Sequence, residues 1–144
     1  MRRLRSSYKD MDIKITIHQT AASTSEAAIR QHKIAIDRPV AKGGDDQGPM
    51  GGELFLAAIG GCFMSNLLAA IKGRQAEVSD AHTEVIGTLA ESPARFTAVD
   101  LNVTAKYSDR EQFEKLVEIA DRGCIMMNTL RGKFDITVRI AALV

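Results

Sequence analysis

The sequence is poor in the residues that build metal sites and disulfide scaffolds, with two cysteines, three histidines and no tryptophan in 144 residues. Two cysteines are too few for a disulfide framework, and the histidines at positions 18, 32 and 82 show no zinc-type spacing. We therefore expect no metal and no other cofactor. Nineteen basic and eighteen acidic residues give a net charge of +1, so nothing indicates a nucleic-acid partner.

The N-terminal basic cluster, MRRLRSSYK, is not followed by an apolar segment. Because a secretory or twin-arginine signal needs such a segment, we expect a flexible tail over residues 1–11 and a single domain over residues 12–144. The length suits one domain with a core of ordinary size. A chain without a signal is expected in the cytoplasm, where cysteines rest as reduced thiols.

The longest uncharged stretch is LFLAAIGGCFMSNLLAAI, eighteen residues from 54 to 71 with Cys62 in its middle. A membrane span begins at about this length, but Gly60, Gly61, Ser65 and Asn66 argue against one. A helix that is apolar on all sides and lies outside lipid must be covered by protein on all sides. One sheet covers one face, so we predict a central helix buried between a sheet and a second subunit.

Alternation of polar and apolar residues predicts the strands, which lie at residues 12–20, 27–37 (one strand or two), 82–91, 96–107 and 133–144. The first of them has Ile13, Ile15 and Ile17 on one half-buried face. The third and fourth predict an antiparallel hairpin, with a bulge near Ala98 and Val99.

A second helix is predicted to begin at Ser108 with a capping box that is completed by Glu111, and Gly123 is predicted to stop it as a left-handed C′ residue. The segment IMMNTLRG that follows Cys124 predicts a further short helical turn. Strands interrupted by two helices, without a βαβ alternation, favour an α+β domain with a mainly antiparallel sheet.

The longest irregular segment, VAKGGDDQGPMGG at residues 40–52, has five glycines and leads into the Cys62 helix. It matches neither GxxxxGK[ST] nor GxGxxG, and Asp45 and Asp46 would repel a phosphate, so we exclude a nucleotide site. We expect this segment to form the rim of a pocket beside Cys62.

The two cysteines differ in their predicted surroundings. Cys62 lies in the middle of an apolar helix, where a cysteine is commonly an inert small hydrophobic residue. Cys124 lies at the start of a helical turn, where free amides and the helix dipole lower a thiol pKa, and Arg122 and Arg131 could add positive charge. A purely structural role for Cys124 in the core stays open beside the reactive one.

The segment GGDDQGPMGGELFLAAIGGCF, residues 43–63, resembles the OsmC/Ohr family of thiol-dependent peroxidases. Members carry a glycine-rich loop, a Glu-Leu-(Leu/Phe) helix start and a cysteine in a long apolar helix. The segment GCIMMNTL, residues 123–130, resembles the second cysteine segment of the family. The resemblance covers residues 13–140 and implies an OsmC-like, intertwined homodimer with the cysteine helices packed at its centre.

The resemblance implies an enzyme, a cysteine-based peroxidase that reduces organic hydroperoxides and, more weakly, hydrogen peroxide. Cys62 would be the peroxidatic thiolate that becomes a sulfenic acid. Cys124 would resolve it to a Cys62–Cys124 disulfide, which a small or protein dithiol would reduce. Glu53, nine residues before Cys62, resembles the glutamate of the less characterised OsmC-like branch. Arg38, Phe63 and Met126 would bind substrate.

The sequence departs from the family pattern at two places. The usual Cys-Pro-x-Ser reads Cys-Ile-Met-Met at residues 124–127, and the first strand turn, residues 21–26, has no arginine. Arg30 or Arg38 could replace that arginine. These departures favour the alternative of a non-catalytic OsmC-like dimer that binds a ligand or senses redox state. The methionines at positions 64, 126 and 127 would suit a fatty or aromatic hydroperoxide.

Overall fold

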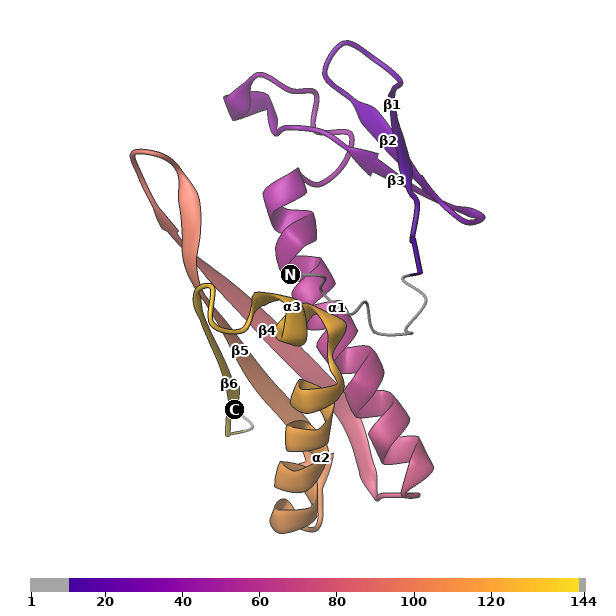
Figure 1. The fold of residues 1–144 in the computed structure, drawn as a ribbon, viewed down its shortest axis with the longest axis vertical. Helices are drawn as coiled ribbons and strands as arrows, with labels where there is room; N and C mark the ends of the chain where they lie inside the picture. Colours follow the sequence, from indigo (N-terminus) through magenta and orange to yellow (C-terminus); the bar gives the residue numbers. More distant parts are fainter. Residues whose placement is uncertain (1–10, 143–144) are drawn as a thin grey trace, which may run out of the picture. The chain divides into compact units, whose positions relative to one another are not determined.

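The computed structural model describes residues 11–142, so the predicted flexible tail lies, apart from Met11, outside the described residues. The chain divides near Gly51 into an N-terminal and a C-terminal compact unit. The described residues form two three-stranded sheets, one long helix and shorter helices (Figure 1). The fold is α+β and mainly antiparallel, as predicted, but with two sheets where one was expected.

The N-terminal unit contains a sheet of order β1–β2–β3, formed by Thr16–Gln19, Ser25–Ile29 and His32–Ile36. Both strand pairs are antiparallel. The strand predicted at residues 12–20 is shorter in the structure, because β1 pairs with β2 only over the register Thr16–Ala28 to Gln19–Ser25. Ile13 and Ile17 are 85% and 55% exposed, so the buried face predicted for this strand does not form within the chain.

The loop after β3 is built around the buried carboxylate of Asp37. Its Oδ2 accepts hydrogen bonds from the Thr24 hydroxyl (3.0 Å) and from the backbone N–H groups of Asp45 and Gln47 (both 3.2 Å). Its Oδ1 accepts the N–H of Arg38 at 2.7 Å. Burial alone would raise the pKa of Asp37, but these hydrogen bonds outweigh burial and lower it to about 2.

The glycines of this loop allow close backbone packing inside the unit. A Cβ at Gly44 would lie 2.0 Å from the carbonyl oxygen of Arg38, and one at Gly48 would lie 2.3 Å from that of Ala35. Gly43 follows the short 3-10 turn η1 (Val40–Lys42) with a φ of 85°. That the loop also forms the rim of a pocket beside Cys62 stays a prediction.

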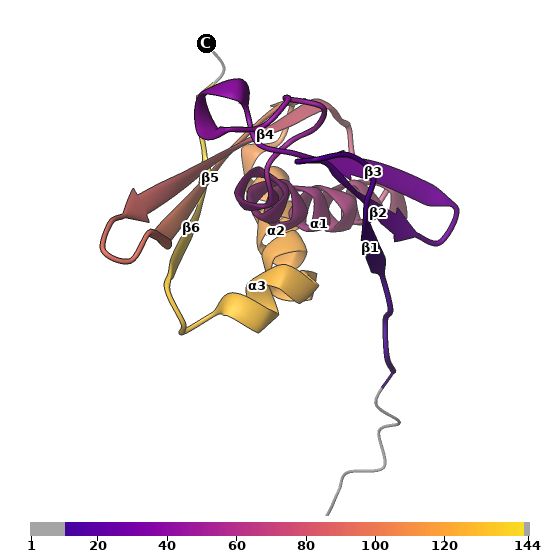
Figure 2. The same cartoon turned by 90° about the horizontal axis from the view of Figure 1, so that it is seen from above.

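The C-terminal unit contains a sheet of order β4–β5–β6, formed by Val78–Ala90, Arg95–Tyr107 and Asp135–Ile140. The helices are α1 (Gly51–Gly73), α2 (Arg110–Gly123) and α3 (Ile125–Leu130). β4 and β5 form the predicted antiparallel hairpin, with the bulge at Thr97, and β6 pairs parallel to β5. Figures 1 and 2 show the three helices on one face of this sheet.

The start and end of α2 differ by one residue from the prediction. The N-cap is Asp109 and not Ser108, because the Asp109 carboxylate accepts the N–H of Gln112 at 3.0 Å. Gly123 is the last helical residue, and Cys124 is at once the C-cap of α2 and the N-cap of α3. A left-handed glycine was expected, but the immediate start of α3 removes the need for one.

The core of the C-terminal unit lies between α1, α2 and the inward face of β5. Its fully buried members include Ile59, Phe63, Leu67, Val99, Leu101, Val103, Ala105, Phe113, Leu116, Ala120 and Cys124. Only 28% of the most apolar 18 residues of α1 are buried within the chain. Leu68, for example, is 52% exposed. By length and composition α1 could cross a membrane, a criterion that the core helix of a soluble protein also meets. The second subunit predicted for its other face stays a prediction.

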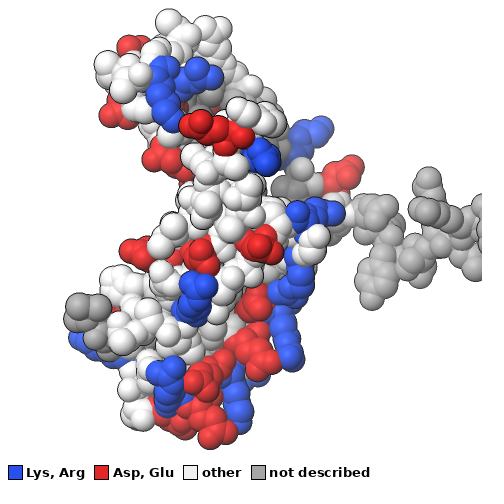
Figure 3. All heavy atoms as spheres, turned by 90° about the vertical axis from the view of Figure 1, so that its left-hand side faces the viewer, with Lys and Arg blue, Asp and Glu red and all other residues white. Residues whose placement is uncertain are grey.

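Charged side chains of both signs are interspersed on the face shown in Figure 3. Along α2 they form (i, i+4) ion pairs between Arg110 and Glu114 (2.9 Å), Glu111 and Lys115 (3.3 Å), and Glu118 and Arg122. Exposed pairs of this kind contribute about 0.3–0.5 kcal/mol each, so the position of α2 is determined mainly by its buried apolar face.

The Asp37 loop predicts a specific acid sensitivity. Because the pKa of Asp37 is lowered in the folded state, its stabilising effect is present above its ordinary pKa of about 4 and is lost as the pH falls toward about 2. In Asp37→Asn this pH dependence should disappear, and the amides of Asp45 and Gln47 should exchange hydrogen faster at neutral pH. Asp46→Asn removes the same charge from the same loop and serves as control; equal exchange in both variants would contradict the prediction.

The close approach of α1 to β4 predicts that alanine has opposite effects on stability at the adjacent positions Gly60 and Gly61. A Cβ at Gly60 would lie 2.5 Å from Cγ2 of Val85, whereas among the described residues nothing lies within 4 Å of a Cβ at Gly61. Gly60→Ala should lower the free energy of unfolding by about 1–3 kcal/mol through overpacking. Gly61→Ala should raise it by up to about 1 kcal/mol through helix propensity. Urea unfolding measures both, and a Gly60→Ala protein as stable as wild type would refute the tight contact.

A candidate two-cysteine site

The two cysteines come from different elements of the C-terminal unit. Cys62 lies in the fourth turn of α1, is partly buried and packs against the core. Cys124 lies at the junction of α2 and α3 and is completely buried. Both are free thiols. The fold thus brings together two residues that are 62 positions apart in the sequence.

Hydrogen-bond donors from the start of α3 surround the Cys62 sulfur. Burial raises the pKa of Cys62, but the backbone N–H of Met126, the thiol of Cys124 and the backbone N–H of Ile125 lower it, and the net result is a lowered pKa. The donors act because hydrogen bonds to the thiolate favour the charged form.

The pKa of Cys124 moves in the opposite direction. Burial and the neighbouring Cys62 sulfur raise the pKa of Cys124, and they outweigh the backbone N–H groups of Met127 and Met126, which lower it. Cys62 raises it because the Cys124 proton is held in a hydrogen bond and because a second negative charge is unfavourable there. Cys62 therefore ionises first, while Cys124 remains a protonated donor beside it. Adjacent sulfur atoms are also the first requirement for a disulfide.

Asn66 is a site residue that had no predicted role. Its side-chain Nδ2 donates to the carbonyl oxygen of Cys62 at 2.9 Å and lies 3.9 Å from the Cys62 Sγ. A Cβ at Gly123 would lie 3.2 Å from Asn66 Oδ1, so the amide fills the space between α1 and the end of α2. The signal was a polar side chain one turn after Cys62 in an otherwise apolar helix.

The other predicted site residues lie in different elements of the two units. Met126 contacts it through its backbone amide, and Phe63 is a fully buried core residue. Glu53 lies in the first turn of α1, nine residues before Cys62, which is about 14 Å along the helix and on its opposite side. Arg38 belongs to the N-terminal unit. The roles assigned to these residues stay predictions.

A cavity of the C-terminal unit with a volume of about 500 Å³ is not lined by either cysteine. It lies between the end of α2, α3 and β6, with Asp121, Arg131 and Lys133 beside the apolar Met127, Phe134 and Ile136. Among residues 11–142, no group of three or more His, Cys, Asp or Glu side chains is placed to hold a metal ion. The chemical groups that the site brings together are two adjacent thiols whose pKa values move in opposite directions.

Structures of similar fold come from several bacteria. An OsmC-like protein from Mycoplasma pneumoniae has a TM-score of 0.80 at 16% identity, with 94% of this chain and 100% of that chain covered. An organic hydroperoxide resistance protein OsmC from Legionella pneumophila has a TM-score of 0.69 at 20% identity, covering 96% and 100%. The organic hydroperoxide resistance protein OhrB of Bacillus subtilis has a TM-score of 0.66 at 26% identity, covering 91% and 98%.

The sequence itself matches one family model. The search of curated proteins found no match to this sequence. The model that describes the OsmC-like protein family matches residues 43–139, which contain both cysteines, α1, α2 and α3 and most of the C-terminal sheet. The chain belongs to the OsmC-like protein family.

Proposed function

We propose that the chain is a thiol-dependent peroxidase that reduces organic hydroperoxides and, more weakly, hydrogen peroxide. The observation that supports this best is the arrangement of donors around Cys62, where two backbone amides and the Cys124 thiol lower its pKa. A thiolate is the reactive form of cysteine toward peroxides. The names of the Legionella and Bacillus proteins, which refer to organic hydroperoxide resistance, agree with this function.

In the first step the Cys62 thiolate attacks the terminal oxygen of the hydroperoxide. A sulfur–oxygen bond forms, the oxygen–oxygen bond breaks, and the alkoxide leaves and takes a proton from solvent to become an alcohol. Sulfur is oxidised by two electrons to a sulfenic acid, and the peroxide is reduced by the same two. Cys62 is partly exposed, which lets a hydroperoxide reach it, whereas Cys124 is completely buried.

In the second step Cys124 attacks the sulfur of the Cys62 sulfenic acid. A disulfide forms, and the hydroxyl group leaves as water with the proton of the Cys124 thiol. An external small or protein dithiol then returns both cysteines to thiols by exchange and is itself oxidised to a disulfide. The hydrogen bond between the two thiols supports this division of roles, because the resolving group already lies beside its target.

We propose a cytoplasmic homodimer as the working form. The apolar side of α1 that the chain leaves open, together with the exposed Ile13 and Ile17, would be covered by a second copy. The half-buried Met126, whose backbone N–H approaches Cys62, favours an apolar hydroperoxide over hydrogen peroxide.

A second function, redox sensing or ligand binding without turnover, is favoured by the character of the donors. The groups that lower the Cys62 pKa are two amides and a thiol, all of them neutral. A positive charge would stabilise a thiolate more strongly than neutral donors do. A slowly reacting thiol pair would then report on the redox state of its surroundings instead of removing peroxide.

Replacement of Cys124 should change the reactivity of Cys62 in a way that depends on the donor. Cys124→Ala removes the thiol donor and should raise the Cys62 pKa by about half to one pH unit, whereas Cys124→Ser keeps a hydroxyl donor and should raise it less. The rate of iodoacetamide alkylation at Cys62, followed by mass spectrometry across pH, measures this. Faster alkylation of Cys124 than of Cys62 in the wild type would reverse the assigned roles.

The peroxidase function is tested with one equivalent of cumene hydroperoxide. Wild type should form an intramolecular disulfide, Cys124→Ser should gain about 16 Da as a sulfenic acid at Cys62, and Cys62→Ser should not react at a comparable rate. Free-thiol titration and intact mass measure these products. Thiols that survive for hours in the wild type would reject the peroxidase and leave the sensing or ligand-binding function.

A further inference from the structure

The position of α3 decides what surrounds the Cys62 sulfur. This helix has six residues, Ile125–Leu130, and a helix of that length is not stable by itself. It nevertheless supplies the two backbone N–H groups that point at Cys62 and begins directly after Cys124. Ile125 stands at its first position, where a proline would have fixed φ in advance. Contacts from outside α3 must therefore hold its start.

One such contact spans the junction at Cys124. The side-chain Nδ2 of Asn128 donates to the backbone carbonyl of Arg122 at 3.0 Å, and the backbone N–H of Asn128 donates to the carbonyl of Cys124 at 2.9 Å. The Arg122 carbonyl lies in the last turn of α2, where carbonyls lack a partner within the helix. Asn128 thus ties the end of α2 to the first turn of α3 on both sides of Cys124.

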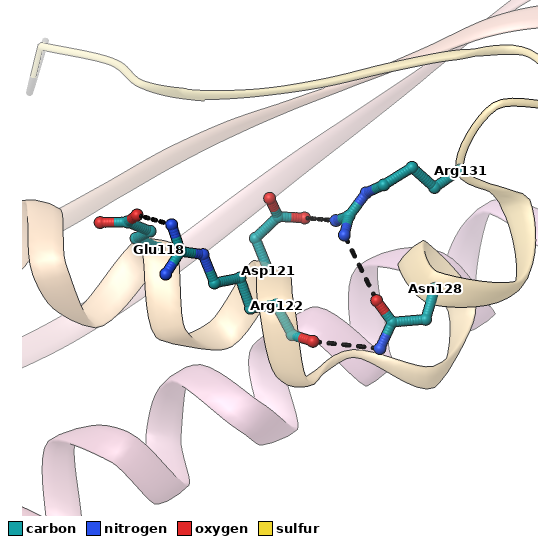
Figure 4. A network of polar contacts seen from close by, with 5 residues as sticks. All are labelled: Glu118, Asp121, Arg122, Asn128 and Arg131. Atoms are coloured by element: carbon teal, nitrogen blue, oxygen red, sulfur yellow. Dashed lines mark hydrogen bonds and ion pairs between the residues drawn. The ribbon is translucent and has the colours of Figure 1, made fainter.

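A second contact ties the far end of α3 back to α2. Arg131 follows the last residue of α3, and its Nη2 lies 3.0 Å from Asp121 Oδ1 in α2. Its Nη1 donates to the side-chain oxygen of Asn128 at 3.4 Å. In Figure 4 the guanidinium of Arg131 points back toward Asp121 and Asn128. Dashed lines join Asp121 to Arg131, Arg131 to Asn128, and Asn128 to the backbone carbonyl of Arg122.

Buried apolar side chains hold α3 on its other side. Cys124 is completely buried and Met127 is 1% exposed, and both belong to the core cluster. Apolar contacts are not directional, so they fix the depth of α3 more than its rotation. The polar contacts of Asn128 and Arg131 are directional and lie on the exposed side. Together the two sets fix the direction of the α3 amides.

We propose that Asn128 and Arg131 are positioning residues that hold α3 so that Cys124 and the amides of Ile125 and Met126 stay directed at the Cys62 sulfur. The consequence for resolution of a sulfenic acid rests on the proposed peroxidase function. The consequence for the resting thiol does not, because those donors act on Cys62 before any peroxide is present.

The first test needs no peroxide and measures the pH profile of Cys62 alkylation by iodoacetamide. In Asn128→Ala and Arg131→Gln the midpoint should rise by about half to one pH unit, because the amide donors are no longer held in place. Arg131→Lys, which can still pair with Asp121, should recover part of the change. Glu114→Ala breaks an exposed arginine pair in the same α2 helix and should leave the profile unchanged.

The second test follows the sulfenic acid after one equivalent of cumene hydroperoxide. A dimedone-type probe should trap more Cys62 adduct in Asn128→Ala and Arg131→Gln than in wild type, with disulfide formation slowed by about tenfold, because misplacement of the attacking group by even about 1 Å is costly. Glu114→Ala should behave as wild type.

Wild-type profiles in both variants, with circular dichroism showing folded protein, would overturn the proposal. If Asn128→Ala fails to fold, Arg131→Gln decides alone, because Arg131 is largely exposed and lies outside the core. If the wild type consumes no hydroperoxide, the peroxidase function fails, but the alkylation profile still decides the positioning role. A changed profile in an inactive protein would keep Asn128 and Arg131 as positioning residues of a redox-sensing pair.

Discussion

The hydrogen-bond donors that approach the Cys62 sulfur are the interaction on which the candidate site of the C-terminal unit depends. A sulfur in an apolar helix loses water, and this loss favours the neutral thiol. The amides of Ile125 and Met126 and the Cys124 thiol replace the lost water. These donors reach Cys62 only if α3 begins directly after α2, so the junction at Cys124 serves the site as much as the fold.

The apolar character of α1 imposes a second constraint, which the single chain meets only in part. Ile59, Phe63 and Leu67 pack on one side and are completely buried, and Gly60 brings the helix backbone close to Val85 on β4. Cys62 lies between the buried and the open sides and is partly exposed. In the proposed homodimer, the second subunit on the open side would therefore lie next to the Cys62 sulfur, and it would shape the proposed substrate site as well as cover apolar surface.

The parts of the fold that could be predicted are those whose signal is local. The hairpin β4–β5 and the helix α2 follow from the periodic spacing of apolar residues in the sequence. The buried residues of β5, from Val99 to Ala105, match the alternation of polar and apolar residues in that strand. What escaped prediction depends on neighbours distant in sequence: the parallel pairing of β6, the exposure of β1, and the contacts of Asn66 and Asn128. The hydrogen-bond partner of a polar residue near a cysteine cannot be predicted before the packing of the helices is known.

The difference between the two thiols follows from their places in the fold and could not have been assigned from the residues alone. Cys124 stood at a helix start, which by itself favours a low pKa, yet its complete burial and the adjacent Cys62 sulfur outweigh the amide of Met127. Cys62 stood in the middle of a helix, yet it receives the amides that the start of α3 offers. The N-terminal amides of α3 thus act on both cysteines, but for Cys124 burial and the neighbouring Cys62 sulfur outweigh them. This arrangement leaves one reactive sulfur and one protonated donor in contact, which is the order that a peroxidatic and a resolving thiol require.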